Sequence, residues 1–176
     1  VANMKLPRLG QQPLRLEFEV GPNRMAIPRT TVLNAFSGQI VVGPVAASDL
    51  YTNRMILETD LTLRNIDIDT LLKGVWPQIK GGTLAGRLDS VRLEGRRLLS
   101  IGLLTTHIFG GSIDIIDPGI SGLMTSVPVL KFSSRINDLD LEQMTAGTGF
   151  GKIRGILQGS VEGLEIVDGQ PQRFAL

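Results

Sequence analysis

The feature that most constrains this chain is an internal repeat with a spacing of 73 residues. Without any gap, residues 36–103 align with residues 109–176. The identical pairs include Phe36/Phe109, Gly38/Gly111, Ile40/Ile113, Ser48/Ser121, Leu57/Leu130, Asp67/Asp140, Gly82/Gly155, Leu84/Leu157 and Gly86/Gly159. Glycines align with glycines in one constant register, which a merely Gly- and Leu-rich composition does not produce. The alignment predicts stacked copies of one supersecondary unit.

The repeat also predicts how the chain is organised. Residues 36–108 and 109–176 are each expected to form one repeat unit, and residues 1–35 to be the tail of a preceding unit. A chain of 176 residues is long enough for one continuous β domain with a sizeable core. Repeat arrays need end caps, and neither end of this sequence reads as a cap, so we expect a fragment of a longer protein.

Alternation of apolar and polar residues predicts β-strands within each unit. It marks residues 14–20, 55–63 and 130–136, while 83–93 and 153–166 read as strands interrupted by glycine. The apolar positions change parity near Ser90, which predicts a β-bulge there, and the interval 119–128 reads as a loop. The fold expected is mainly β, an elongated and mostly antiparallel sheet with one aliphatic and one polar face.

Each unit also contains one short helical segment. Asp69 and Glu142 follow a predicted strand directly, in positions typical of an N-cap or a first-turn acid, and Gly-rich loops follow both segments. We therefore expect one short helix in each repeat unit.

Composition excludes several classes of function. The formal net charge is +1 and aromatic residues make up 5% of the chain, which disfavours a nucleic-acid partner. The chain has no cysteine, so thiol chemistry and cysteine-type zinc sites are excluded. The longest uncharged run, 98–113, is too short to span a bilayer as a helix.

Candidate catalytic and metal-binding residues are few. His107 is the single histidine and has no Ser or carboxylate at a recognisable catalytic spacing, so a structural strand histidine is the favoured interpretation. The acids Asp67, Asp69, Asp138 and Asp140 alternate with Ile and Leu, which is typical of the solvent face of a strand rather than of a calcium loop. We expect no enzyme activity, no cofactor and no metal.

The segment 65–72 and its second copy 138–144, each followed by a Gly-x-Leu-x-Gly-x-Leu/Val strand at 82–88 and 155–161, resemble the AsmA-like family of bacterial envelope proteins. The similarity is strongest to the YdbH-like members, which have TamB-like relatives. The resemblance implies a long, curved, folded-over β-sheet with a groove for phospholipid. It also implies a periplasmic location, an inner-membrane anchor outside this fragment, and envelope proteins as partners.

The resemblance and the alternation together predict a phospholipid-conducting groove between the inner and outer membranes. The residues expected to face the acyl chains are Leu14, Leu16, Phe18, Val20, Leu57, Leu61, Leu63, Leu84, Leu88, Leu130, Phe132, Leu157 and Val161. The alternative is a passive β-solenoid or β-sandwich stalk, or an adhesin-like interaction domain, in which the same residues would fill a closed core.

Overall fold

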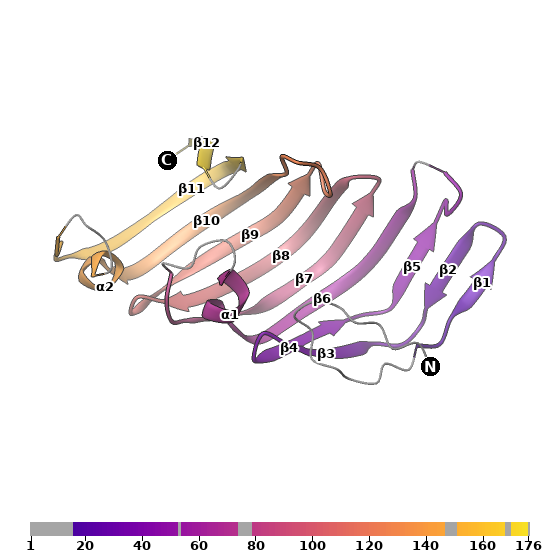
Figure 1. The fold of residues 1–176 in the computed structure, drawn as a ribbon, viewed down its shortest axis with the longest axis horizontal. Coiled ribbons are helices and arrows are strands. Elements are labelled where there is room, and N and C mark those ends of the chain that lie inside the picture. Colours follow the sequence, from indigo (N-terminus) through magenta and orange to yellow (C-terminus); the bar gives the residue numbers. More distant parts are fainter. Residues whose placement is uncertain (1–15, 53, 74–78, 147–150, 168–169, 176) are drawn as a thin grey trace.

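The computed structural model describes residues 16–52, 54–73, 79–146, 151–167 and 170–175. The chain runs as one antiparallel sheet that is extended strand by strand along its length (Figure 1). Its elements are β1 (Glu19–Gly21), β2 (Arg24–Ile27), β3 (Thr31–Ala35), β4 (Gly38–Val42), β5 (Val45–Ser48), β6 (Ile56–Asp67), α1 (Ile68–Leu72), β7 (Thr83–Glu94), β8 (Arg97–Ile108), β9 (Gly111–Ser121), β10 (Val129–Asp140), α2 (Leu141–Thr145), β11 (Ile156–Val167) and β12 (Gln170–Ala175). The prediction of a mainly β, antiparallel sheet is confirmed.

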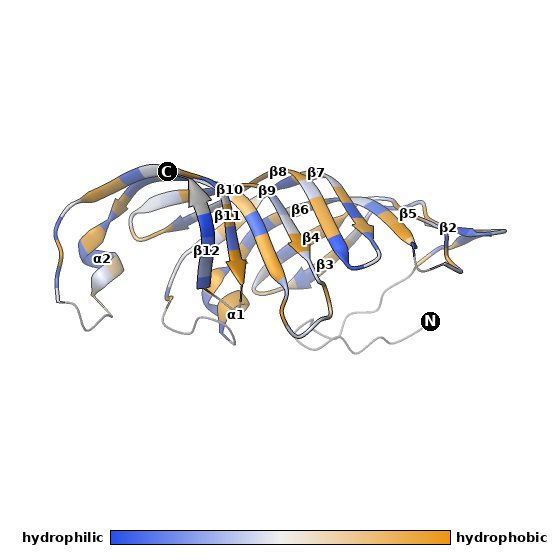
Figure 2. Ribbon diagram, turned by 90° about the horizontal axis from the view of Figure 1, so that it is seen from above, coloured by the Kyte–Doolittle hydropathy of each residue, from blue (hydrophilic) through white to orange (hydrophobic). Residues whose placement is uncertain are grey.

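The sheet is open. Its strand order is β1-β2-β5-β6-β7-β8-β9-β10-β11-β12, and β3 pairs with β4, which in turn pairs with β6. In the view from above, the sheet arches over α1 and α2 (Figure 2). We call the side of the sheet that faces these helices the inner face, and the other side the outer face.

The sheet divides into two short branches at its first strands. Strand β6 pairs with β4 through residues 61–64 and with β5 through residues 56–58. The break between β4 and β5 falls at Gly43 and Pro44, and the break between β2 and β3 begins at Pro28. Proline has no backbone N–H to donate to a ladder, so each of these breaks lies where a long strand would lose a hydrogen bond.

Several elements recur at the spacing seen in the sequence. The bounds of β6, α1 and β7 shifted by 73 residues are those of β10, α2 and β11. The irregularities recur too: the β6–β7 register shifts at Thr59/Leu61 and Leu63/Ile66, and the β10–β11 register shifts at the corresponding Phe132/Ser134 and Ile136/Leu139. A further register shift, between Leu88 and Ser90 of β7 against β8, confirms the bulge predicted near Ser90.

Three sequence-based boundaries need correction. The predicted strand 153–166 starts too early, because β11 begins at Ile156. Of the described part of the predicted strand 14–20, only the residues from Glu19 onward lie in β1, so Leu16 and Phe18 precede the strand. The predicted loop 119–128 is too long at its start, because β9 continues to Ser121. That end of β9 is fixed by pairing with β10, at Val129↔Ser121 and Leu130↔Ile120, which local sequence does not show.

The helices begin where the acidic residues predict. Asp67 caps α1 and Asp140 caps α2, and Asp69 and Glu142 are the acids of the first turns. The carboxylate of Asp67 accepts a hydrogen bond from the Thr70 backbone N–H at 2.8 Å, which satisfies a donor that the helix itself leaves unpaired.

Candidate functional site

The candidate site is the inner face, and the cross-strand registers define which residues belong to it. Residues directly opposite each other in an antiparallel pair point to the same side of the sheet. Leu61 pairs with Leu88, and Ile66 pairs with Leu84. Leu88 and Leu84 belong to a buried cluster against which Leu71 and Leu72 of α1 pack. The leucine and isoleucine positions of β6 and β7 therefore face the helices.

The inner face is uncharged across its central strands. Its registered positions in β6 to β11, as far as the structure describes them, carry aliphatic residues, one phenylalanine, glycines or small hydroxyl residues. The hydroxyl residues are Thr59, Ser100, Thr106 and Ser134. The Ser100 hydroxyl donates a hydrogen bond to the Pro118 carbonyl, and the Thr59 hydroxyl donates one to the Gly43 carbonyl at 3.3 Å. These two hydroxyls are satisfied within the chain.

The half of the inner face next to the helices is a packed core. Ile66 and Leu139 are each 2% exposed. Leu84 and Leu88 are buried in the same cluster, and Leu61, Leu63 and Leu157 pack against it. Here the aliphatic residues fill the space between sheet and helices with their own side chains.

The other half of the inner face carries one unbroken row of apolar residues that crosses nine strands. Each member pairs directly with the next: Val20, Met25, Ala47, Leu57, Leu93, Leu98, Ile120, Leu130 and Ile166. We call this set the open row. Apart from the buried Ala47 and the exposed Val20, its members are half-buried. With strands ~4.8 Å apart, the row is about 38 Å long.

The structure separates the thirteen residues predicted to line a groove into groups. Val20, Leu57 and Leu130 lie in the open row. Six others lie on the inner face in the half next to the helices. Leu84 and Leu88 belong to the buried cluster, Leu61, Leu63 and Leu157 pack against it, and Val161 lies on the same face. Phe132 pairs with Leu164 on the same face. Leu16 and Phe18 lie outside the strands, and Leu14 lies outside the described residues.

Six members of the open row were not predicted from the sequence, namely Met25, Ala47, Leu93, Leu98, Ile120 and Ile166. Leu93 and Leu98 pair next to Glu94 and Arg97, which flank the two-residue turn of the β7–β8 hairpin, and Gly95 in that turn was the available signal. Ala47 has a small side chain and therefore gives a weak apolar signal. Ile120 falls in the interval 119–128, which was predicted to be a loop.

The outer face combines charged residues with the exposed Leu99, Ile101 and Leu103 of β8. It carries two ion pairs at corresponding positions, in which the acid and the base are exchanged. Arg92 Nη1 lies 2.7 Å from Glu58 Oε1, and Lys131 Nζ lies 3.1 Å from Glu165 Oε1. Residue 58 corresponds to residue 131, and 92 to 165, so the acid and the base have exchanged strands. Each pair is partly exposed to solvent and contributes little to stability by itself.

His107 and the acidic residues are placed as parts of the fold. His107 is exposed on the outer face, opposite Thr83 of β7 and Ser112 of β9. Asp138 accepts a hydrogen bond from the Gln158 side chain. Among the described residues, no three His, Cys, Asp or Glu side chains gather closely enough to hold a metal ion.

The helix caps lower the pKa of two carboxyl groups. The side-chain hydrogen bond with Thr70 is the largest cause for the pKa of Asp67, and that with Gln143 is the largest for the pKa of Asp140. Gln143 Nε2 donates to Asp140 Oδ2 at 3.1 Å. Both groups favour the charged form that accepts hydrogen bonds at the helix start.

We expect these caps to make the stability of the fold depend on acid pH. A folded-state pKa below the unfolded value gives a stabilisation that is present above about pH 4 and is lost as the pH falls through the folded pKa. Asn caps a helix as well as Asp does but does not titrate. Thermal unfolding followed by circular dichroism should show a smaller loss between pH 5 and pH 2 for D67N/D140N than for the wild-type chain. Equal losses would contradict this account.

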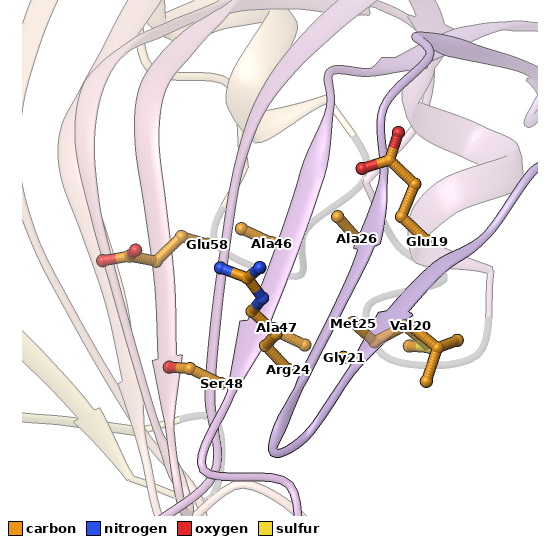
Figure 3. Close-up of a pocket in the computed structure, with 10 residues that line it drawn as sticks. All are labelled: Glu19, Val20, Gly21, Arg24, Met25, Ala26, Ala46, Ala47, Ser48 and Glu58. Carbon is orange, nitrogen blue, oxygen red and sulfur yellow. The ribbon is translucent and has the colours of Figure 1, made fainter.

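A hollow of about 600 Å³ lies at the first strands (Figure 3). Ala26 and Ala46 are directly opposite each other and leave space because their side chains are small. Glu19 pairs with Ala26, and Ala46 pairs with Glu58, so a carboxylate stands on each side of the two alanines. Arg24 also lines the hollow. The ten residues that line it include no histidine and no cysteine.

Comparison of the chain with protein-family models, curated proteins and solved structures finds no match. Within the described residues, no helix has the length and apolar character needed to cross a membrane.

Proposed function

We propose that this chain is a segment of a lipid-transfer protein and that the open row carries the acyl chains of phospholipids. The observation that supports this best is the unbroken apolar register across nine strands, from Val20 to Ile166. The row is about 38 Å long, and the hydrocarbon of one bilayer leaflet is about 15 Å thick. An acyl chain would therefore move along the row without leaving an apolar surface.

The energetics favour such a surface for transfer. Each buried CH₂ contributes about 0.8 kcal/mol, so exposing a sixteen-carbon chain to water costs on the order of 12 kcal/mol. Leu, Ile and Val side chains offer contact without fixed hydrogen bonds. A ligand held in this way slides instead of stopping at one position.

The proposal includes the architecture around the row. We propose that the elements recurring at 73 residues are repeat units, with residues 36–108 and 109–176 as two of them and 1–35 as the tail of another. The units would align their apolar registers end to end and so extend one groove. Through its resemblance to AsmA-like proteins, we place the protein in the periplasm, anchored to the inner membrane outside this segment.

A closed core is the competing arrangement. A β-sandwich stalk would cover the inner face with a second sheet, whereas the described strands all belong to one sheet. The short helices lie at one end of the long strands (Figure 1). The open-row residues of these strands lie near the other end, and among them only Leu98 also packs against the buried cluster. This separation favours the groove over the stalk.

The test compares two variants that each place one carboxylate on β8, one on the inner face and one on the outer face. Leu98 lies in the open row, and Leu99 next to it on β8 is 53% exposed on the outer face. We expect L98D to reduce co-purifying phospholipid roughly ten-fold, because a carboxylate in an acyl path is costly to desolvate. L99D should retain wild-type lipid. Circular dichroism would establish that both variants are folded, and unchanged lipid in folded L98D would refute the proposal.

A further inference from the structure

The β5–β6, β7–β8 and β9–β10 loops lie at the strand ends opposite α1 and α2 (Figure 1). The backbone N–H of Gly95, in the β7–β8 turn, donates to the Met55 carbonyl of the β5–β6 loop at 3.2 Å. The backbone N–H of Leu123, in the β9–β10 loop, donates to the Arg96 carbonyl at 2.9 Å. These hydrogen bonds hold three connections side by side. We call this surface the loop margin.

Large apolar side chains of the loop margin project into solvent. Met124 is 94% exposed, Tyr51 is 83% exposed and Val127 is 52% exposed. They come from two different loops on the same margin. A group of exposed apolar residues at loop tips marks a surface that meets a partner, and tyrosine is enriched where proteins meet the membrane–water interface.

The same margin carries three arginines with no ionic partner in the described part of the chain: Arg54 and Arg96 lie in loops, and Arg97 is the first residue of β8. The side chains of Arg54, Arg96 and Arg97 have no carboxylate oxygen within 4.0 Å there, whereas Arg87 and Arg92 of the outer face each pair with acids. Two acids lie nearby: Glu94, which is directly opposite Arg97 in the β7–β8 hairpin, and Asp49. Glu94 lies 3.6 Å from Arg92, and Asp49 accepts a hydrogen bond from Asn23 at 3.1 Å.

We propose that the loop margin docks on the surface of an anionic lipid bilayer. The arginines would contact lipid phosphates, and Tyr51 and Met124 would enter the interfacial region. Charge complementarity favours this occupant over a second copy of the chain, because two such margins facing each other would place arginines against arginines. The whole chain has a formal charge of +1, so the attraction comes from this local grouping.

Docking would also bring the open row to the membrane. Leu93 and Leu98 form the cross-strand pair next to the Glu94↔Arg97 pair that closes the β7–β8 turn, and Arg96 lies in that turn. The attraction to the bilayer does not depend on the proposed lipid transfer, because it rests on the loops alone.

The test is co-sedimentation of the full chain with unilamellar vesicles. We expect binding to phosphatidylcholine vesicles containing phosphatidylglycerol at about 30 mol%. The binding should fall in about 1 M salt, where the Debye length is ~3 Å. Each basic residue near an anionic surface contributes about five-fold, so R96A/R97A should lower partitioning roughly 25-fold.

The matched control removes two charges from the opposite margin. Lys73 and Lys80 lie on the helix side of the sheet, away from the loop margin. K73A/K80A should therefore bind vesicles as strongly as the wild-type chain does. M124S should lower partitioning several-fold without a change in charge. The proposal would be overturned if the wild-type chain did not bind anionic vesicles. It would also be overturned if R96A/R97A bound them as strongly as the wild-type chain does. Lipid co-purified with the L98D variant reports separately on the groove.

Discussion

Ile66→Ala is expected to lower the free energy of unfolding by about 2–5 kcal/mol, which is the cost of a large-to-small change in a packed core. Ile66 is 2% exposed and belongs to the buried cluster that includes Ile68, Leu84 and Leu139. Removing its side chain leaves a cavity between the sheet and α1. Denaturant unfolding followed by circular dichroism measures the loss.

Two further variants test whether the loss of stability depends on the burial of the side chain or only on the removal of an aliphatic group. Leu139 is also 2% exposed and stands 73 residues after Ile66, so Leu139→Ala should cost a similar amount. Ile101 is 65% exposed on the outer face, and Ile101→Ala should change stability by less than about 0.5 kcal/mol. Equal losses for Ile66→Ala and Ile101→Ala would mean that the inner face is not the core.

Local sequence was sufficient to predict the long strands with the clearest alternation, but it assigned no range to β2–β5, β8, β9 or β12. Alternation marks residues 55–63 and 130–136, and all of these except Met55 lie within β6 and β10. The acids at 69 and 142 marked both helices, with the N-cap two residues earlier in each. Alternation and capping are properties of neighbouring residues, so they are visible without knowledge of the fold.

Cross-strand register was not available from the sequence. Alternation predicts that Leu57 and Leu130 share a face with their own strand neighbours, but it does not show that both lie in a single row with Ile120. That row depends on each hairpin turn and on the bulge at Ser90, because a slip of one residue would move a side chain to the opposite face.

The same limit explains why the groove residues fell into two groups. Leu84 and Leu57 alternate with polar residues in the same way, yet Leu84 is buried near α1 and Leu57 belongs to the open row. What separates them is distance from the helix along the strand. The short helices return onto the sheet only after the chain has folded, and periodicity contains no information on where they pack.

Gly86→Ala and Gly159→Ala are expected to differ sharply although the two glycines occupy corresponding positions. Gly86 has a φ of +146°, and a Cβ built there would lie 2.2 Å from the Leu103 carbonyl oxygen of β8. At Gly159 a Cβ would meet no atom within 4 Å. β8 contacts Gly86 closely through the Gly86↔Leu104 pair, whereas Gly159 pairs with Ile136 of β10.

Gly86→Ala therefore requires backbone movement of β7 against β8 in addition to an unfavourable φ, and we expect a loss of about 3 kcal/mol or more. Gly159→Ala should leave stability within about 0.5 kcal/mol of wild type, or raise it slightly by restricting the unfolded chain. Denaturant midpoints of the two variants, with unchanged slopes, measure the difference. A Gly86→Ala chain as stable as the Gly159→Ala chain would show that β7 and β8 do not approach each other in this way.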